Sequence, residues 1–268
     1  MKNTNKSAIL VVSFGTSYED TRKITLDAIE EKIREEFKEF EVRKAYTSNM
    51  IIKKLKERDG IFVDTPVEAL SKLKEDGYEK IIVQPLHVMP GEEYDKIKLC
   101  VHRFEKEESF HKIVLGKPLL YQTKDYEIVI EAMKEELVEK NEDKALVLMG
   151  HGSYHHANSC YALLDYMLKS KGYENTFVAT VEETPTLEDV IKRLKDKNIK
   201  EVTLKPFMIV SGDHAKNDMA SDEEDSWKTI LEKEGFKVNI NLHALGENEN
   251  IRQIYINNKI GRAHVWTP

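Results

Sequence analysis

Two histidines of this chain stand beside glycines in short loops, each after an apolar, strand-like segment. His151 lies in the sequence Gly-His-Gly-Ser (150–153), directly after Ala145–Met149. His214 follows Ser-Gly-Asp, beyond the segment Glu201–Lys205. Glycines permit sharp turns at strand ends and leave a neighbouring imidazole free to project. On this pattern alone, His151 could instead be hydrogen-bonded within its own turn, and Asp213 beside His214 could be the N-cap of a helix.

An acidic pair ends the apolar segment that lies between these two histidines in the chain. Glu182 and Glu183 follow Phe177–Val181 and precede Pro185, which is typical of the start of a helix. One glutamate can then face the same strand ends as the histidines. Glutamate near a helix start is also favoured by the helix dipole, so the pattern leaves the choice between Glu182 and Glu183 open.

Taken together, these side chains indicate a metal site. The carboxyl ends of parallel strands meet at one edge of a sheet, so His151, His214 and one glutamate should converge there. Two imidazoles and a carboxylate, with coordination positions left open, suit a divalent first-row ion that is bound and then released. Asp213 is a candidate acceptor for the second ring nitrogen of His214. Because neutral imidazole is the ligating form, metal loading should fall below about pH 6.5.

Other candidate residues give weaker signals. His155 and His156 follow the His151 loop and either flank the site or are simply exposed. His87 lies in another strand-end loop, ahead of Glu92 and Glu93. These two carboxylates could assist deprotonation of a substrate, but the start of a helix is the favoured interpretation.

Short apolar runs alternate with amphipathic stretches along the whole chain. Strands are expected at Ala8–Val12, Glu41–Ala45, Lys80–Gln84, Lys112–Leu115, Ala145–Met149, Phe177–Val181, Glu201–Lys205 and Lys237–Leu242. Helices are expected at Asp20–Phe37, Val67–Asp76, Tyr126–Glu139, Tyr161–Lys171, Leu187–Lys197 and Ser226–Glu234. Continuous apolar strands between helices predict an α/β fold with doubly wound parallel sheets, covered by helices on both faces.

Two strand–loop units occur twice, in the same order. Ala8–Ser17 matches Ala145–Tyr154, and Ile82–Gly91 matches Thr203–Gly212. The duplication predicts two similar lobes, 1–123 and 124–258, with a ligand-binding cleft between them and the metal ligands in the second lobe. The last residues, 259–268, break the pattern of the preceding helical start and are expected to be a non-native tail.

Composition excludes several classes of function. The chain has 268 residues, a net charge of −7 and a pI of about 5.8, which disfavours nucleic-acid binding. Its two cysteines, Cys100 and Cys160, indicate neither a disulfide framework nor a zinc site. No apolar stretch approaches the roughly 20 residues of a membrane helix, so a cytoplasmic protein without membrane contact is expected. Walker A, Gly-x-Gly-x-x-Gly and Gly-x-Ser-x-Gly elements are absent, so no bound nucleotide or hydrolase triad is expected.

At these motifs the sequence resembles the class II chelatases, most closely the anaerobic sirohydrochlorin cobaltochelatases of cobalamin synthesis. The resemblance runs over Ser7–Tyr255, and its most specific part is Gly-Asp-His-Ala-Lys-Asn-Asp-Met-Ala-Ser-Asp (212–222). The other matching segments are Val-Val-Ser-Phe-Gly-Thr-Ser (11–17), Pro-Leu-His-Val-Met-Pro-Gly-Glu-Glu-Tyr (85–94), Met-Gly-His-Gly-Ser (149–153) and Val-Glu (181–182).

The resemblance implies two flavodoxin-like lobes and a metal chelatase, classed as a lyase, that inserts Co²⁺ into the tetrapyrrole sirohydrochlorin without a nucleotide. His151 and His214 would hold the metal and take up pyrrole protons, with Glu182 as the third ligand. Lys205 and Lys216 would be candidates for binding the substrate's carboxylates. A homo-oligomer is compatible with this assignment.

Three alternatives stay open at this point. The chain could deliver Fe²⁺ or Ni²⁺, or act on another tetrapyrrole, because the order of metal affinities does not single out cobalt. It could be a non-catalytic carrier of metal or tetrapyrrole. It could also be a flavodoxin-like module that cradles a phosphate in the loop Ser-Phe-Gly-Thr-Ser (13–17).

Overall fold

The described residues of this computed structural model, 6–139 and 143–258, form two compact units. The first unit comprises residues 6–121 and 252–258, and the second comprises the described part of 122–251. The chain therefore returns to the first unit at its last helix, whereas the sequence analysis placed residues up to 258 in the second lobe. The predicted non-native tail, 259–268, lies outside the described residues.

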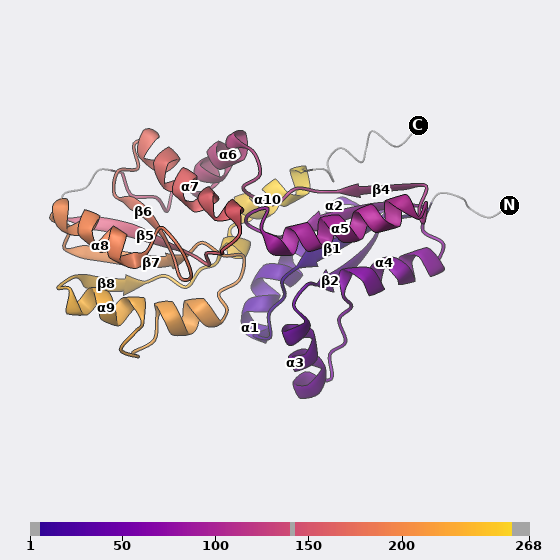
Figure 1. The fold of residues 1–268 in the computed structure, drawn as a ribbon, viewed down its shortest axis with the longest axis horizontal. Coiled ribbons are helices and arrows are strands. Elements are labelled where there is room, and N and C mark those ends of the chain that lie inside the picture. The colour runs from indigo at the N-terminus through magenta and orange to yellow at the C-terminus, as the bar shows by residue number, and fades with distance from the viewer. Residues whose placement is uncertain (1–5, 140–142, 259–268) are drawn as a thin grey trace. The chain divides into compact units, whose positions relative to one another are not determined.

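Each unit is built around one parallel four-stranded sheet flanked by helices (Figure 1). The strand orders are β2-β1-β3-β4 in the first unit and β6-β5-β7-β8 in the second. The strands are β1 (Ser7–Ser13), β2 (Glu41–Tyr46), β3 (Lys80–Pro85), β4 (Lys112–Leu115), β5 (Lys144–Gly150), β6 (Thr176–Thr180), β7 (Glu201–Pro206) and β8 (Lys237–Ile240). The two sheets thus have the same topology, and the predicted α/β class with two similar flavodoxin-like lobes is confirmed.

The central strands are buried because their apolar runs are continuous. Ala8–Val12 in β1 is at most 1% exposed, and Ala145–Met149 in β5 is at most 3% exposed. A strand with helices on both faces has no solvent side, so polar and apolar residues do not alternate along it. In each unit these strands form the centre of the hydrophobic core.

The helices connect successive strands. They are α1 (Glu19–Arg22), α2 (Ala28–Glu36), α3 (Asn49–Asp59), α4 (Pro66–Glu75), α5 (Glu92–Lys106), α6 (Thr123–Met133), α7 (Ser159–Ser170), α8 (Leu187–Asp196), α9 (Trp227–Lys233) and α10 (Glu249–Asn257). Two π-helices, η1 (Lys23–Asp27) and η3 (Ala215–Met219), and two short 3₁₀ segments, η2 (His156–Asn158) and η4 (Leu245–Glu247), complete the order. Reciprocal capping boxes begin α4 at Thr65 and α8 at Thr186.

Two predicted helices differ from those in the structure. The helix expected over Asp20–Phe37 is divided by η1, which the 3.6-residue periodicity of its apolar positions did not reveal. The helix expected over Tyr126–Glu139 ends at Met133. Beyond it, Thr176 Oγ1 accepts a hydrogen bond from Val138 N at 2.8 Å, so this extended segment is held by a side chain of β6.

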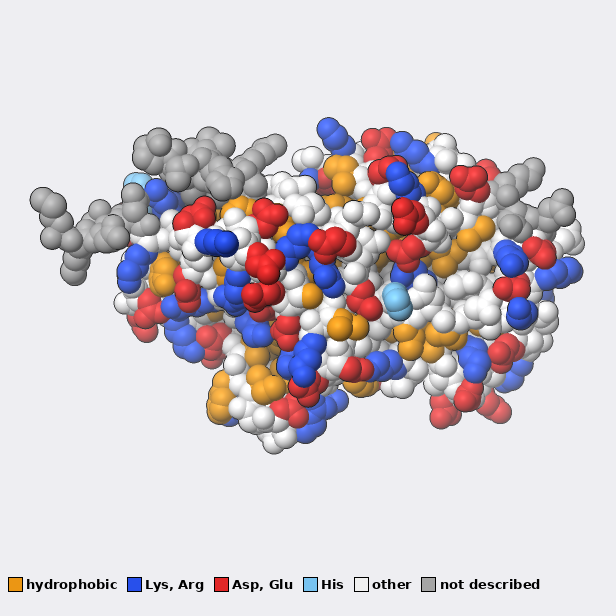
Figure 2. Space-filling model, turned by 180° about the vertical axis from the view of Figure 1, so that it is seen from behind, with side chains coloured by type: hydrophobic (Ala, Val, Ile, Leu, Met, Phe, Trp, Pro, Cys, Tyr) orange, Lys and Arg blue, Asp and Glu red, His pale blue; other side chains and the backbone are white. Residues whose placement is uncertain are grey.

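The surface carries mixed charge on the face drawn in Figure 2, where acidic and basic side chains are interspersed. Among the described helices, none combines the length and apolar character needed to cross a bilayer. Both cysteines are buried and unpaired with each other.

Candidate metal centre

The candidate residues follow three neighbouring strands of the second sheet. His151 comes directly after β5, Glu182 follows β6, and His214 follows β7. In the order β6-β5-β7-β8, the chain passes from β5 to β6 on one side of it and then crosses to β7 on the other side. Such a switch point, at the carboxyl ends of parallel strands, is where open α/β sheets bind ligands.

Backbone hydrogen bonds join the loop after β5 to the loop after β6. Val181 N donates to Gly150 O at 3.1 Å, and Glu182 N donates to His151 O at 3.0 Å. Asn158 Nδ2 also donates to Thr184 O at 2.6 Å, across the same pair of loops. The backbones that carry His151 and Glu182 are therefore fixed relative to each other before any metal binds.

The two glycines beside His151 are each required, for different structural reasons. A Cβ on Gly150 would lie 2.3 Å from Tyr161 Cε1, so the loop packs directly on the Tyr161 ring. Burial raises the pKa of the Tyr161 hydroxyl to about 12. Hydrogen bonds from the backbone of Gly152 and His151 to this hydroxyl lower the pKa, but by less. Gly152 has φ +86°, and a Cβ there would lie 2.9 Å from Glu183 N and 3.0 Å from Glu182 N. Only glycine fits this close approach without strain.

The three predicted side chains converge in the structure. One potential ligand atom from each of His151, Glu182 and His214 lies within 4.8 Å of the others. His151 Nε2 is 3.9 Å from Glu182 Oε1, and the two imidazole rings meet edge to face with centroids 4.6 Å apart. Side-chain exposures of 45%, 43% and 32%, respectively, leave all three open to solvent. Glu183 is not a member of this cluster.

Both imidazoles are oriented by an oxygen at Nδ1. His151 Nδ1 lies 2.8 Å from Gly152 O, and His214 Nδ1 lies 2.5 Å from Asp218 Oδ2. A carbonyl or carboxylate oxygen accepts, so each Nδ1 donates its proton and each Nε2 keeps a lone pair. This is the tautomer that binds a metal through Nε2, with the outer oxygen fixing the direction of the ring.

Asp218, rather than Asp213, is the acceptor that contacts His214. The backbone turns helical at Asp213 and His214, ahead of η3, so residue 218 lies one turn further along on the same side. Asp213 instead accepts a hydrogen bond from Asn217 Nδ2 at 2.9 Å. The i, i+4 spacing of His214 and Asp218 was the available sequence signal. From the sequence, only Asp213, the immediate neighbour of His214, was considered as the acceptor, and residue 218 was not.

The first unit repeats this loop framework with different side chains. Ser48 N donates to Phe14 O, as Glu182 N does to His151 O, and Gly15 has φ +96° where Gly152 has +86°. Phe14 and Ser48 therefore occupy the positions of the histidine and the glutamate. The duplication preserved the backbone of the site, and within the described residues the His–Glu–His set occurs only in the second unit.

His87 belongs to the first unit and lies in its strand-end loop, where the residue is partly exposed but both ring nitrogens are buried. Neither ring nitrogen has a hydrogen-bond partner among the described residues. Burial lowers the pKa of His87 to about 4, and the nearby Glu93 carboxylate opposes this shift only partly. Glu92 and Glu93 form the first turn of α5, which agrees with the helix-start interpretation.

The remaining candidates have mostly structural roles. His155 caps η2 by accepting a hydrogen bond from Ala157 N at 3.2 Å, and His156 is exposed. The expectation that Lys205 binds substrate carboxylates is wrong, because its side chain is only 3% exposed. Its Nζ lies 2.8 Å from Glu136 Oε2 and donates to His243 O. Lys216 lies in η3 between His214 and Asp218 and is half-buried.

Comparison with known proteins places the chain in a family. Residues 7–263 match the model of a family described as cobalt chelatase (CbiK). The chain is 40% identical over 251 residues to a protein named sirohydrochlorin cobaltochelatase from Salmonella typhimurium strain LT2, covering 94% of both chains. It is 30% identical over 256 residues to sirohydrochlorin cobaltochelatase CbiKC from Nitratidesulfovibrio vulgaris strain Hildenborough, covering 94% of this chain and 88% of the relative.

Solved structures agree on the fold. SirB from Bacillus subtilis, solved with Fe³⁺, superposes with a TM-score of 0.60 at 16% identity, over 94% of this chain and 93% of SirB. CbiX, described as the terminal enzyme of sirohaem biosynthesis in denitrifying bacteria, gives a TM-score of 0.51 at 17% identity, over 96% and 99% of the two chains. At these identities the likeness concerns the fold alone. The match over nearly the whole sequence shows that the chain belongs to the cobalt chelatase (CbiK) family.

Proposed function

We propose that this chain is a sirohydrochlorin cobaltochelatase, which inserts Co²⁺ into sirohydrochlorin for cobalamin synthesis and needs no nucleotide. The observation that carries the proposal is the convergence of His151, Glu182 and His214 within 4.8 Å at a sheet switch point. The names of two relatives, each aligned over 94% of this chain, supply the substrate class.

In the proposed reaction the three side chains first take the metal from water. Two neutral imidazoles and one carboxylate replace part of the hydration shell, and the remaining positions stay open for the pyrrole nitrogens. Half-exposed ligands suit this task, because a fully enclosed site would retain the ion. Co²⁺ is thus a substrate that passes through the site.

The histidines would also accept the protons that the macrocycle releases. Insertion of one M²⁺ releases two N–H protons from the macrocycle, so two acceptors are needed for each turnover. Once the ion has left, the Nε2 atoms of His151 and His214 are free, and imidazole is the side chain best matched to proton transfer near neutral pH. Gly152 O and Asp218 already occupy the Nδ1 positions, so incoming protons would go to Nε2.

The deciding experiment is an insertion assay with purified protein, sirohydrochlorin and Co²⁺, without any nucleotide. The absorption spectrum of the metallated product should appear faster than in the uncatalysed control, over many turnovers. Product limited to one equivalent per chain would instead identify a carrier. Parallel assays with Fe²⁺ and Ni²⁺ assign the metal, and a faster rate with either would contradict the choice of cobalt.

A further inference from the structure

The edge strands of the two sheets are protected to different degrees. On the outer edge of β2, Arg34 Nη1 donates to Val42 O at 2.6 Å, and Tyr46 N donates to Asp64 O at 3.0 Å. On the outer edge of β6, Val178 N donates to Asp165 Oδ1 at 3.1 Å, and the Lys169 ammonium donates to Thr176 O. Such caps prevent an edge from pairing with another chain.

The outer edge of β4, and that of β8 in the second sheet, carry no comparable caps among the described residues. Lys112 N and Gly116 N donate to Glu79 O and Val83 O, so both point toward β3. By the alternation of a strand, the amides and carbonyls of Ile113 and Leu115 point away from the sheet. No hydrogen bond joins these outward groups to any other residue in the described part of the chain.

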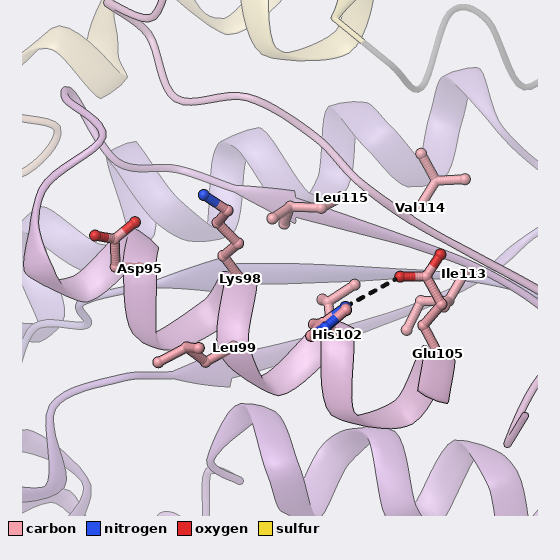
Figure 3. A pocket seen from close by; sticks show the side chains of 9 residues that line it. Asp95, Lys98, Leu99, His102, Glu105, Ile113, Val114 and Leu115 are labelled. Carbon is pink, nitrogen blue, oxygen red and sulfur yellow. Dashed lines mark ion pairs between the residues drawn. The ribbon is translucent and has the colours of Figure 1, made fainter. Parts of the chain in front are cut away.

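A groove of about 620 Å³ runs beside this open edge, between β4 and the outer face of α5 (Figure 3). It is lined by Asp95, Lys98, Leu99, Val101, His102, Glu105, Ile113, Val114 and Leu115. Leu99, in the middle of the 15-residue helix α5, is 69% exposed. Unpaired strand groups are a template for pairing with another chain, and Leu99 adds apolar surface beside them.

Lys98 and Glu105 carry opposite charges at opposite ends of the groove, and Glu105 Oε2 also lies 3.5 Å from His102 Nδ1 of the same helix. α5 and β4 run in opposite directions along the groove, with Lys98 toward Leu115 and Glu105 toward Ile113 (Figure 3). A two-fold axis near Val114 reverses this order in a second copy. It would place Lys98 of each copy opposite Glu105 of the other, on the two sides of the axis.

We propose that the β4 edge and this face of α5 form an isologous interface with a second copy of the chain, in which the two β4 strands pair antiparallel. Pairing would satisfy the outward groups of Ile113 and Leu115 and extend each four-stranded sheet into a continuous eight-stranded one. It would also cover Leu99 and bring each Lys98 to a Glu105. The interface involves no residue of the candidate metal centre, so it stands independently of the proposed function.

Sedimentation of the full chain at concentrations up to about 100 μM tests the proposal, since even a modest specific contact is populated there. We expect a concentration-dependent dimer. Lys98→Glu and Glu105→Lys should each weaken it by about tenfold or more, because each change brings like charges together twice in a two-fold interface. The double charge swap should restore it to within about threefold of wild type. Lys106→Glu makes the same charge change on α5 outside the groove and should leave the dimer unchanged.

A second pair of variants tests the strand edge itself. Ile113→Pro removes an outward amide without removing a bond to β3, and should weaken the dimer. Val238→Pro makes the equivalent change on the outer edge of β8 and is the matched control, with circular dichroism confirming that both variants fold. A wild-type chain that stays monomeric overturns the proposal. So does a dimer that resists both single charge changes, or one that responds equally to Ile113→Pro and Val238→Pro.

Discussion

At the scale of single residues, the candidate site depends on three side chains that carry the metal and two oxygens that aim the imidazoles. Nε2 of each histidine is left free because Nδ1 is occupied by Gly152 O or Asp218. Each member of this set therefore has a distinct and measurable consequence when it is changed.

Removing either imidazole should abolish most of the metal insertion. We expect His151→Ala and His214→Ala each to lower kcat/KM by at least about 100-fold, because a ligand and a proton acceptor are lost together. Both side chains are partly exposed, so the folded state should be retained. His156→Ala, an exposed histidine near the same loop, is the control. Near-normal rates in both test variants would refute the site assignment.

The acceptor of His214 should matter almost as much as a ligand. Asp218→Ala removes the oxygen that holds Nδ1–H, and we expect the affinity for Co²⁺ to fall by about 10- to 100-fold. Asp218→Asn keeps an acceptor oxygen and should lose less. Isothermal titration with Co²⁺ measures both. An alanine variant with wild-type affinity would mean that the 2.5 Å contact does not orient the ring.

At the scale of elements, the loops after β5 and β6 act as one unit. Their two backbone hydrogen bonds and the close approach of Gly152 position His151 and Glu182 together. The loop after β7 contributes differently, because it turns helical at Asp213 and His214 and so brings Asp218 Oδ2 to Nδ1 of His214.

Gly152 is the position at which this coupling can be tested. Gly152→Ala must adopt φ +86° and also place a methyl group 2.9 Å from Glu183 N, so it should lower both stability and Co²⁺ affinity. Gly172→Ala shares a positive φ of +94° but has no atom within 4 Å of the new methyl. Gly172→Ala should therefore lower the free energy of unfolding only by the backbone strain, about 1 kcal/mol. Urea denaturation and metal titration compare the two, and equal losses of stability and of affinity would argue against steric coupling between the loops.

At the scale of the whole molecule, the chain builds its first unit from both ends of the described sequence. α10 returns there, where Tyr255 is fully buried and its hydroxyl donates to His87 O at 3.2 Å. The buried ring nitrogens of His87 make the stability of this unit depend on pH, because burial lowers the pKa of the imidazole.

Stability should fall in mild acid because His87 is held neutral. Its pKa of about 4 in the folded chain lies below the ordinary value of 6.5, so the unfolded chain binds more protons between these values. The unfolding free energy is therefore unaffected by His87 above pH 6.5, and it falls as the pH drops from 6.5 toward 4. Between pH 7 and 5, wild type should lose about 2 kcal/mol more unfolding free energy than His87→Leu, which has no titrating group. Denaturant titrations at both pH values measure this, and parallel losses in the two proteins would contradict it.

Much of this organisation was predictable from local sequence. Continuous apolar runs, each followed by a loop, predicted all eight strands, because burial on both faces leaves a signal in the residues themselves. The repeated strand–loop motifs predicted two sheets of the same kind. The Gly-His-Gly and Gly-Asp-His loops pointed to His151 and His214, because chemistry at a strand end needs both a glycine turn and a projecting side chain.

Other features were decided only by tertiary structure, because they depend on contacts between residues distant in the chain. The residue pattern left the choice between Glu182 and Glu183 open, and only the family resemblance favoured Glu182. In the structure, Glu182 joins the cluster because its backbone bond to His151 O fixes the position of its loop. The ammonium of Lys205 is buried against Glu136 and is not available to a substrate. The membership of residues 252–258 in the first unit follows from the burial of Tyr255 and Ile256 there. Sequence patterns report which faces are apolar and where turns fall, whereas the partner of each buried polar group is set by packing over long separations.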